Sequence, residues 1–259
     1  MPLDALELTR LAERLAFRGD RRRYYRFRVD RWYGGVASAD VVGCNLRCIF
    51  CWSRSRDPNA PGKLLDPEAV ASKLYELAER RKVRQARLTG GEPTIGWHIH
   101  TGRVAELLVR DYGLHFILET NGILIGLDRR IARALADLAA QGSLEVRVSI
   151  KGAKPETFER ITLVDRRYWE VQLEALEALV EEGLKPGDEV YPAIMMSFDS
   201  EEDIRRLIQR IAGIHPALAE NVDPEYVILY PHVRRRLAKA GIWPRRYFQP
   251  GEPLPEWMI

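Results

Sequence analysis

Cysteine is scarce in this sequence, with three residues among 259, and all three lie within one segment of eight residues. An odd number of cysteines in one short segment is not typical of a disulfide framework, which needs pairs. The clustering instead indicates a metal or cluster site.

Long apolar runs are also absent, because no stretch reaches the roughly 18 residues that a membrane-spanning helix needs. The first twenty residues carry acids among their apolar side chains, so they do not resemble a secretory signal peptide. We therefore expect a cytoplasmic protein that makes no contact with a membrane. Hydrophobic residues make up 46% of the chain and charged residues 30%, which permits a buried core and excludes a disordered chain.

Lysine is rare as well, since 33 of the 40 basic residues are arginines. Nine arginines lie between residues 10 and 31, interleaved with Tyr24, Tyr25 and Phe27, and further arginines lie at 234–236 and 245–246. Arginines with aromatic residues can bind nucleic acid through phosphate contacts and base stacking. Acidic residues dilute the first group, so a solvated helix face or an extension that covers the core is the other interpretation.

Apolar segments typical of strands alternate with longer segments typical of helices. The predicted strands are 36–42, 85–88, 115–119, 144–150, 189–196 and 226–230. The predicted helices are 66–82, 100–111, 128–141, 166–182 and 200–212. This alternation predicts right-handed βαβ crossovers and a parallel sheet in an α/β fold, either a partial barrel or an open doubly wound sheet.

The cysteines form the pattern C-x3-C-x2-C at Cys44, Cys48 and Cys51. Spacing this close lets one short loop direct three thiolates at a single inorganic centre. Cubane iron–sulfur clusters usually take four cysteines, so three cysteines would leave one iron with an open coordination position. A metal with an open position is the arrangement that permits catalysis.

Two other interpretations of the cysteines remain. A structural Cys3His zinc site would need a histidine, and His98, His100 and His115 follow the motif. Structural zinc usually pairs its ligands in two separated knuckles, which this sequence lacks. Buried cysteines that only fill the core are the second alternative, but such residues seldom cluster at this spacing.

The unusual residues of the chain follow the predicted strands. The cysteine motif follows the first strand, and His232 follows the sixth. Glycine-rich or polar segments follow the second, third and fourth strands, namely Gly90-Gly91-Glu92-Pro93, Thr120-Asn121-Gly122 and Lys151-Gly152. Because parallel strands end at one edge of a sheet, we expect all of these residues on one rim, where α/β enzymes have their active sites.

In this order the motifs resemble those of the radical S-adenosylmethionine (radical SAM) superfamily, over roughly residues 36–231. That family places its cysteine motif after the first barrel strand, with an aromatic residue just before the third cysteine, where this chain has Phe50. The resemblance implies a partial (β/α)6 TIM-like barrel of parallel strands. It also implies that Cys44, Cys48 and Cys51 bind one [4Fe-4S] cluster and that Phe50 packs near the adenine of S-adenosyl-L-methionine (SAM).

The resemblance assigns SAM contacts to the segments after the next strands. Gly90 and Gly91 permit close approach of a ligand to the backbone, which would bind the methionyl ammonium, and Glu92 would reinforce the turn or that contact. Thr120 and Asn121 would hydrogen-bond the ribose or the carboxylate of SAM. These roles are implied by the family's motifs and not by spacing alone.

The fourth segment, Ser149-Ile150-Lys151, is placed like the D-x-K segment of glycyl-radical-enzyme activases. Lys151 would offer a cation to the SAM carboxylate. Ser149 stands where the activases have an aspartate, so the resemblance does not extend to a cation site built with that aspartate. Backbone groups of residues 193–197 would contact the adenine.

The resemblance implies reductive cleavage of SAM to a 5′-deoxyadenosyl radical, which abstracts hydrogen from a substrate. A small electron donor such as flavodoxin or ferredoxin would supply the electron. The expected organisation is a basic N-terminal extension (1–35), a radical SAM core (36–231) and a C-terminal tail that covers the core (232–259). An auxiliary cluster of the SPASM or twitch type would need more cysteines, which argues against subclasses that depend on one, including the molybdenum-cofactor cyclase.

Within the superfamily, Glu119-Thr120-Asn121-Gly122 is most similar to segments of glycyl-radical-enzyme activases and 7-carboxy-7-deazaguanine synthases. An enzyme that modifies a nucleobase or a tRNA is the alternative, indicated by the arginines and by the Cys51-Trp52 pair. From another class, a non-catalytic iron–sulfur or zinc protein that senses redox state would carry the same cysteines. A Rossmann-type methyltransferase is disfavoured, because no G-x-G-x-G loop follows the first strand.

Overall fold

A computed structural model describes residues 1–55 and 62–252 of the chain. Its centre is a nine-stranded sheet in the order β1-β2-β3-β5-β6-β7-β8-β9, with β4 paired to β2. The six strands from β3 onward along this path are parallel to one another. They are β3 (Val36–Val41), β5 (Gln85–Thr89), β6 (His115–Thr120), β7 (Leu144–Ile150), β8 (Val190–Met195) and β9 (Asp223–Glu225). The predicted fold class, an α/β partial barrel, is confirmed.

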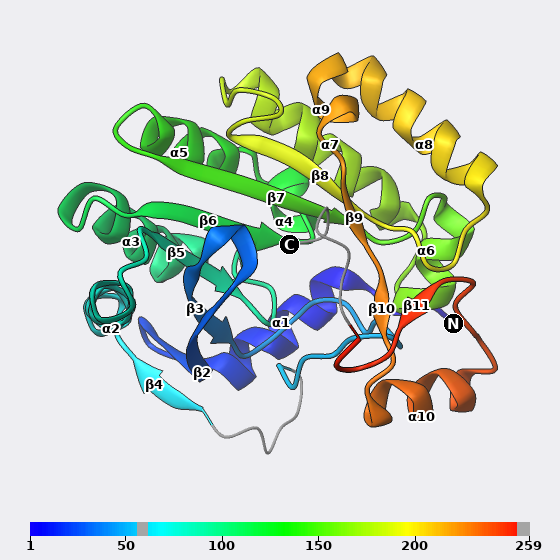
Figure 1. The fold of residues 1–259 in the computed structure, drawn as a ribbon, viewed down its shortest axis with the longest axis horizontal. Helices are drawn as coiled ribbons and strands as arrows, with labels where there is room; N and C mark the ends of the chain where they lie inside the picture. The colour runs from blue at the N-terminus through cyan, green and yellow to red at the C-terminus, as the bar shows by residue number, and fades with distance from the viewer. Residues whose placement is uncertain (56–61, 253–259) are drawn as a thin grey trace.

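Helices follow the parallel strands and cover the outer side of the curved sheet (Figure 1). The longer ones are α2 (Pro67–Arg81), α5 (Arg129–Ala139), α7 (Arg167–Glu181) and α8 (Glu201–Ile214), and the shorter ones are α3 (Thr101–Glu106), α4 (Ile123–Leu127), α6 (Pro155–Thr162) and α9 (Pro216–Glu220). Helix α2 begins where the sequence predicts, since the Asp66 side chain accepts a hydrogen bond from the amide of Ala69 and Pro67 opens the first turn. In the described part of the chain, no helix is long and apolar enough to cross a bilayer.

Strand β7 shows how the sheet separates a core from an inner cavity. Val146 and Val148 are fully buried in the main hydrophobic core, which they share with Leu173 and Leu176 of α7. The alternate residues Glu145, Arg147 and Ser149 line a cavity on the inner face. Because side chains of a strand alternate between its two faces, this pattern places charged groups inside the barrel.

The N-terminal segment joins the same sheet. Helix α1 (Ala5–Ala16) leads into β1 (Phe17–Arg18) and β2 (Arg21–Asp30), and β2 pairs antiparallel with both β3 and β4 (Lys63–Leu65). The arginines of β2 therefore lie on a strand of the sheet instead of on a free helix face, and among them Arg22 is buried whereas Arg21 and Arg26 are exposed. The division of the chain at residues 35 and 231 remains a prediction.

The sixth parallel strand lies earlier than predicted. Strand β9 ends at Glu225, whereas residues 227–228 form β10 (Val227–Ile228), which pairs with β11 (Tyr247–Phe248) in a separate small sheet. Val227 and Leu229 are buried with Val233 and Leu237 of α10 (Pro231–Ala240). The apolar residues at 226–230 thus pack beneath the C-terminal segment. Residues 253–259 of that segment lie outside the described residues.

Candidate active site

The three cysteines lie in the loop that follows β3. The backbone of this loop is held on α6, because the amides of Arg47 and Ile49 donate to the carbonyl oxygens of Thr162 and Ile161 at 3.0 and 2.9 Å. The three cysteines form no disulfide, and all of them line one cavity. Three thiols on one short loop, all lining one cavity, fit the predicted cluster.

The histidines named for a zinc site lie elsewhere and have other partners. His100 is buried between Tyr24 and the carbonyl oxygen of Asp20, at 2.9 and 2.7 Å. His98 pairs with Asp128, and His115 contacts Ser143 and Glu145. The Cys3His zinc interpretation is therefore wrong.

The GGEP segment after β5 packs directly on the start of the cysteine loop. The amide of Glu92 donates to the carbonyl oxygen of Gly43 at 2.8 Å. A Cβ atom at Gly91 would lie 2.2 Å from the same oxygen, and one at Gly90 would lie 2.8 Å from the side chain of Asp40. Gly90 also has a φ of 89°, which favours glycine. These glycines thus set the distance between the two loops.

The carboxylate of Glu92 joins the loops after β5 and β6 and is almost fully buried. It accepts hydrogen bonds from the amide and hydroxyl of Thr94 at 3.1 and 2.7 Å. It also accepts from the Thr120 hydroxyl at 2.6 Å and from the amide of Asn121 at 2.8 Å. Of the two roles expected for Glu92, the structure shows the one that reinforces the turn.

Asn121 links the loop after β6 to the cysteine loop. Its amide nitrogen donates to Asn45 Oδ1 at 2.7 Å, and its side-chain oxygen accepts from the amide of Ile123 at 3.1 Å. The carbonyl oxygen of Asn121 accepts from Gln172 at 2.6 Å. Thr120 and Asn121 line the cavity, as predicted, but both side chains also carry internal contacts. Their hydrogen bonds to SAM remain predictions.

Lys151 and Ser149 meet a carboxylate that the sequence did not indicate. Glu225 of β9 lies 2.8 Å from Lys151 Nζ and accepts from the Ser149 hydroxyl at 2.6 Å. Burial opposes ionisation of Glu225, but the charges of Lys151 and Arg147 outweigh it and lower its pKa to about 2. Burial alone would lower the pKa of Lys151, yet Glu225 and Cys48 keep it above its usual value. Lys151 is therefore a fixed cation near the cysteine loop.

A second charged group lies deeper inside the barrel. Arg87 Nη1 lies 2.9 Å from Glu119, and its Nη2 lies 2.7 Å from Asp30. The Tyr33 hydroxyl donates to Glu119 at 2.8 Å. Burial opposes ionisation of Glu119, but the charges of Arg87 and Arg147 lower its pKa to about 2. Glu119 therefore stays ionised at neutral pH.

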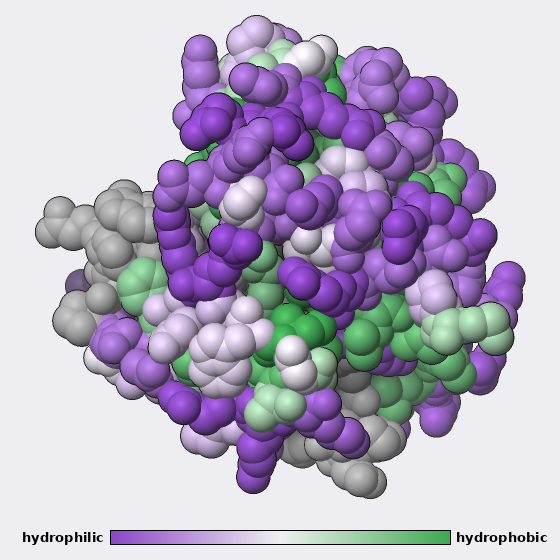
Figure 2. Space-filling model, turned by 90° about the vertical axis from the view of Figure 1, so that its right-hand side faces the viewer, coloured by the Kyte–Doolittle hydropathy of each residue, from purple (hydrophilic) through white to green (hydrophobic). Residues whose placement is uncertain are grey.

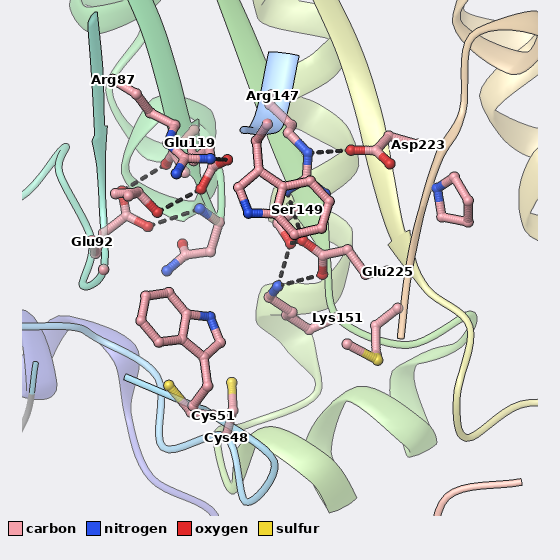
Figure 3. Close-up of a pocket in the computed structure, with 18 of the residues that line it drawn as sticks. Cys48, Cys51, Arg87, Glu92, Glu119, Arg147, Ser149, Lys151, Asp223 and Glu225 are labelled. Atoms are coloured by element: carbon pink, nitrogen blue, oxygen red, sulfur yellow. Dashed lines mark hydrogen bonds and ion pairs between the residues drawn. The ribbon is translucent and has the colours of Figure 1, made fainter. Parts of the chain in front are cut away.

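One cavity of about 1050 Å³ contains both charged groups and the cysteine loop. Figure 3 shows Cys48 and Cys51 at one side of this space, with Lys151, Glu225 and Glu119 facing it from the strands. Ligand pockets in proteins span about 300–1,000 Å³. The cavity therefore has room for SAM together with a small second molecule.

Phe50 lines the cavity and is buried, with its ring 5.5 Å from that of Phe198. This position is compatible with the predicted adenine contact, which remains a prediction. Of residues 193–197, Met195 lines the cavity, whereas the carbonyl oxygen of Ser197 accepts from the amide of Arg245. His232 lies beside the cysteine loop, where its Nε2 contacts the carbonyl oxygen of Trp52 at 3.1 Å.

The sequence does not distinguish Arg22 from the other arginines of residues 10–31, but in the structure it is fully buried beneath the site. Its guanidinium donates to the carbonyl oxygens of Glu92, Pro93 and Ile95 at 2.7–2.9 Å. Burial lowers the pKa of Arg22 to about 10, so it stays charged at neutral pH. Arg22 thus fixes the backbone of the GGEP loop from below.

The chain is similar to known proteins in both sequence and fold. The family model of the Radical SAM superfamily matches residues 40–211. A probable GTP 3′,8-cyclase of Thermococcus kodakarensis is 33% identical over 144 residues, which cover 55% of this chain and 41% of that protein. Molybdenum cofactor biosynthesis protein 1 of Drosophila melanogaster is 31% identical over 160 residues, 61% of this chain and 26% of that protein. The chain thus spans less than half the length of these relatives.

Streptococcus suis SuiB bound to S-adenosylmethionine shares the fold of this chain, with a TM-score of 0.51 and 18% identity over 66% of this chain and 36% of that chain. The curated relatives named above are cyclases and cofactor-biosynthesis proteins, a different group from the activases and deazaguanine synthases that the sequence suggested. The expected grouping with activases and deazaguanine synthases is therefore not supported. The alternative of a non-catalytic iron–sulfur or zinc protein that senses redox state is set aside. The family match includes the cysteine motif and the cavity-lining segments of β5 to β8, so the chain belongs to the radical SAM superfamily and is an enzyme that uses a [4Fe-4S] cluster and SAM.

Proposed function

We propose that this enzyme cleaves SAM reductively to a 5′-deoxyadenosyl radical, which abstracts a hydrogen atom from a small polar substrate held in the barrel. The observation that carries this proposal is the opening of the cysteine loop into the same cavity as the charged groups of β5 to β9. One space thus holds both the residues suited to the cofactors and the residues suited to a substrate.

The chain's own residues bind and orient the two molecules. Cys44, Cys48 and Cys51 hold the cluster, and the backbone at Gly90 and Gly91 offers hydrogen-bonding groups to the methionyl ammonium. The rest of SAM is contacted by Phe50, Thr120, Asn121, Ser149 and Lys151. Lys151 is suited to the methionyl carboxylate, because Glu225 holds its ammonium group in the cavity.

A small polar substrate is favoured because the wall of the barrel is charged. Arg87 and Arg147 have partners of opposite sign, namely Glu119, Asp223 and Glu225. Such pairs can exchange partners with the polar groups of a small ligand, whereas an apolar ligand would leave them without solvation.

A GTP 3′,8-cyclase activity is the second candidate. It is favoured by the 33% identity to the Thermococcus kodakarensis protein over 144 residues. Arg87 and Arg147 line the cavity and would have to exchange their carboxylate partners for the oxygens of the triphosphate. Incubation of the reconstituted enzyme with SAM, dithionite and GTP tests this candidate, and a GTP-derived product in the mass spectrum would confirm it.

The proposed cleavage is tested on enzyme reconstituted anaerobically with iron and sulfide. We expect wild-type enzyme to form 5′-deoxyadenosine from SAM after reduction with dithionite, and Cys48→Ala to form only background amounts. Ser143→Ala serves as the control, because it removes one exposed hydroxyl whose partner is His115, away from the cysteine loop. A Cys48→Ala enzyme that still assembles a full cluster and cleaves SAM at the wild-type rate would show that the proposal is wrong.

A further inference from the structure

Helix α10 lies against the cysteine loop from the outside. Arg236 donates a hydrogen bond to the carbonyl oxygen of Cys51, and His232, one turn earlier, contacts the carbonyl oxygen of Trp52. Burial lowers the pKa of His232, and the charges of Arg236, Arg54 and Arg235 lower it further. These arginines therefore surround one point beside the loop that carries Cys51.

The two segments that meet here contain basic residues and no acidic ones. Residues 44–55 and 231–243 include neither aspartate nor glutamate. Their basic residues are Arg47, Arg54, Arg234, Arg235, Arg236 and Lys239. Six positive charges in two short segments exceed the net charge of +3 that the whole chain carries. We name the exposed part of this region, Arg54, Arg234, Arg235 and Lys239, the basic face.

Several exposed arginines on other helices have carboxylate partners. Arg129 pairs with Glu181, Arg166 with Glu159, and Arg210 with Glu170. By contrast, neither Arg54 nor Arg235 has a carboxylate within 4 Å among residues 1–55 and 62–252. Elsewhere in the C-terminal part of the chain, Glu201 pairs with Arg246 and Glu252 accepts from the amide of Gln249. The basic face thus presents charge that the protein itself does not neutralise.

Aromatic side chains border the basic face. Trp243 and Tyr247 are both exposed, with ring centroids 6.1 Å apart, and the guanidinium of Arg234 lies 5.8 Å from the Trp243 ring. Figure 2 shows the side of the molecule that carries α8 and α10. This surface is largely hydrophilic, with apolar groups gathered in the lower half of the view. Arginine, tryptophan and tyrosine are the residues enriched at protein interfaces and their energetic centres.

We propose that the basic face docks an acidic protein that carries one electron, such as a flavodoxin or a ferredoxin. The inference rests on the proposed function, because reductive cleavage of SAM requires an electron from outside the chain. One electron leaves the reduced carrier, which is thereby oxidised, and is received at the cluster site next to α10. Opposite charges on the two surfaces accelerate the encounter and fix its orientation.

RNA is the other partner that a basic surface could fit, but the arginines of this chain do not form a continuous stripe. Those of β2 that would extend one are engaged: Arg22 is buried, and Arg26 and Arg28 pair with Asp40. A compact charged patch beside the cysteine loop suits a small docking protein better than a long polyanion.

The test compares two reductants on the reconstituted holoenzyme. Formation of 5′-deoxyadenosine is measured with dithionite and, separately, with flavodoxin kept reduced by NADPH and its reductase, at low and high salt. The variant is Arg235→Glu/Lys239→Glu, two exposed residues one turn apart on α10 that make no hydrogen bond or ion pair with the cysteine loop in the described part of the chain. The control is Arg80→Glu/Arg81→Glu, which makes the same charge change at the exposed end of α2.

We expect the apparent KM for flavodoxin to rise about tenfold in the α10 variant and to lose most of its salt dependence, while the dithionite rate stays at the wild-type value. The α2 control should match wild type with both reductants. Equal flavodoxin KM values in all three proteins, or no turnover with flavodoxin where dithionite supports it, would overturn the docking proposal. If the flavodoxin KM values are equal and the α10 variant alone loses salt-sensitive retention of tRNA, the basic face binds RNA and the docking proposal is overturned as well. Failure of wild type with dithionite would instead refute the proposed SAM cleavage.

Discussion

The guanidinium of Arg22 donates a 2.8 Å hydrogen bond to the carbonyl oxygen of Glu92, which lies 70 residues later in the chain. The same guanidinium reaches the carbonyl oxygens of Pro93 and Ile95 and the hydroxyl of Thr101. Glu92 in turn joins the loops after β5 and β6 through its carboxylate. The N-terminal strand β2 therefore helps to hold in place the loops that we propose bind SAM.

We expect Arg22→Met to destabilise the protein by about 3 kcal/mol or more, because it removes several hydrogen bonds from a charged donor to buried carbonyl oxygens. The free energy of unfolding in urea measures the effect. Arg21→Met is the matched control, since Arg21 is exposed and makes one hydrogen bond, to the carbonyl oxygen of Leu64. Its cost should stay within about 1 kcal/mol. Similar losses for the two variants would contradict the role assigned to Arg22.

Gly91→Ala should abolish SAM binding, because the added methyl group would lie 2.2 Å from the carbonyl oxygen of Gly43 and force the two loops apart. Gly213→Ala is the control, as this glycine lies in α8, has no atom within 4 Å of a new Cβ and has no positive φ. The control should raise the free energy of unfolding by about 0.5–1 kcal/mol. Equilibrium dialysis with labelled SAM and urea unfolding measure the two outcomes. Wild-type SAM affinity in Gly91→Ala would refute the close packing of the loops.

The parallel strands, their helices and the rim of motifs could be predicted from the sequence, because apolar segments and turn residues are local signals. The positions of Arg22 and Glu225 could not. Arginine is seldom fully buried, so nothing local distinguishes Arg22 from its neighbours Arg21 and Arg23. Glu225 reaches Lys151 only because β9 lies next to β8 and β8 next to β7, an arrangement set by the packing of the whole sheet.

The arrangement inside the barrel also depends on which strand face turns inward. In β7, alternation alone separates Glu145, Arg147 and Ser149 from the buried valines. The partners of these residues come from strands up to 78 residues away, as with Arg147 and Glu225. Sequence reasoning therefore finds the polar positions of one strand but not the ion pairs that connect several strands.

The stability of the protein at acidic pH should depend on Glu225. Its pKa is lowered from 4.5 to about 2 in the folded protein by Lys151 and Arg147, against the opposing effect of burial. A lowered folded-state pKa stabilises the protein above about pH 4.5, and this contribution is lost as the pH falls towards 2. In Glu225→Gln, urea unfolding midpoints should therefore fall less steeply between pH 4.5 and 2. Cluster-free protein is used, because thiolate ligation is itself sensitive to acid. If the unfolding midpoints of Glu225→Gln and wild type fall equally steeply with pH, Lys151 and Arg147 do not lower the pKa of Glu225.

Lys151→Met should weaken SAM binding by about tenfold to a hundredfold, as expected for the loss of a hydrogen bond between charged groups. Tyr191→Phe is the control inside the same cavity, because Tyr191 lies near the start of β8, whereas the proposed SAM contacts follow the ends of the strands. Its hydroxyl donates to Glu145 at 2.8 Å, and its removal should leave SAM affinity unchanged. Dialysis of reconstituted enzyme against labelled SAM measures both variants. If the two variants bind SAM equally well, Lys151 is not a SAM ligand, and its pairing with Glu225 serves the substrate side of the cavity.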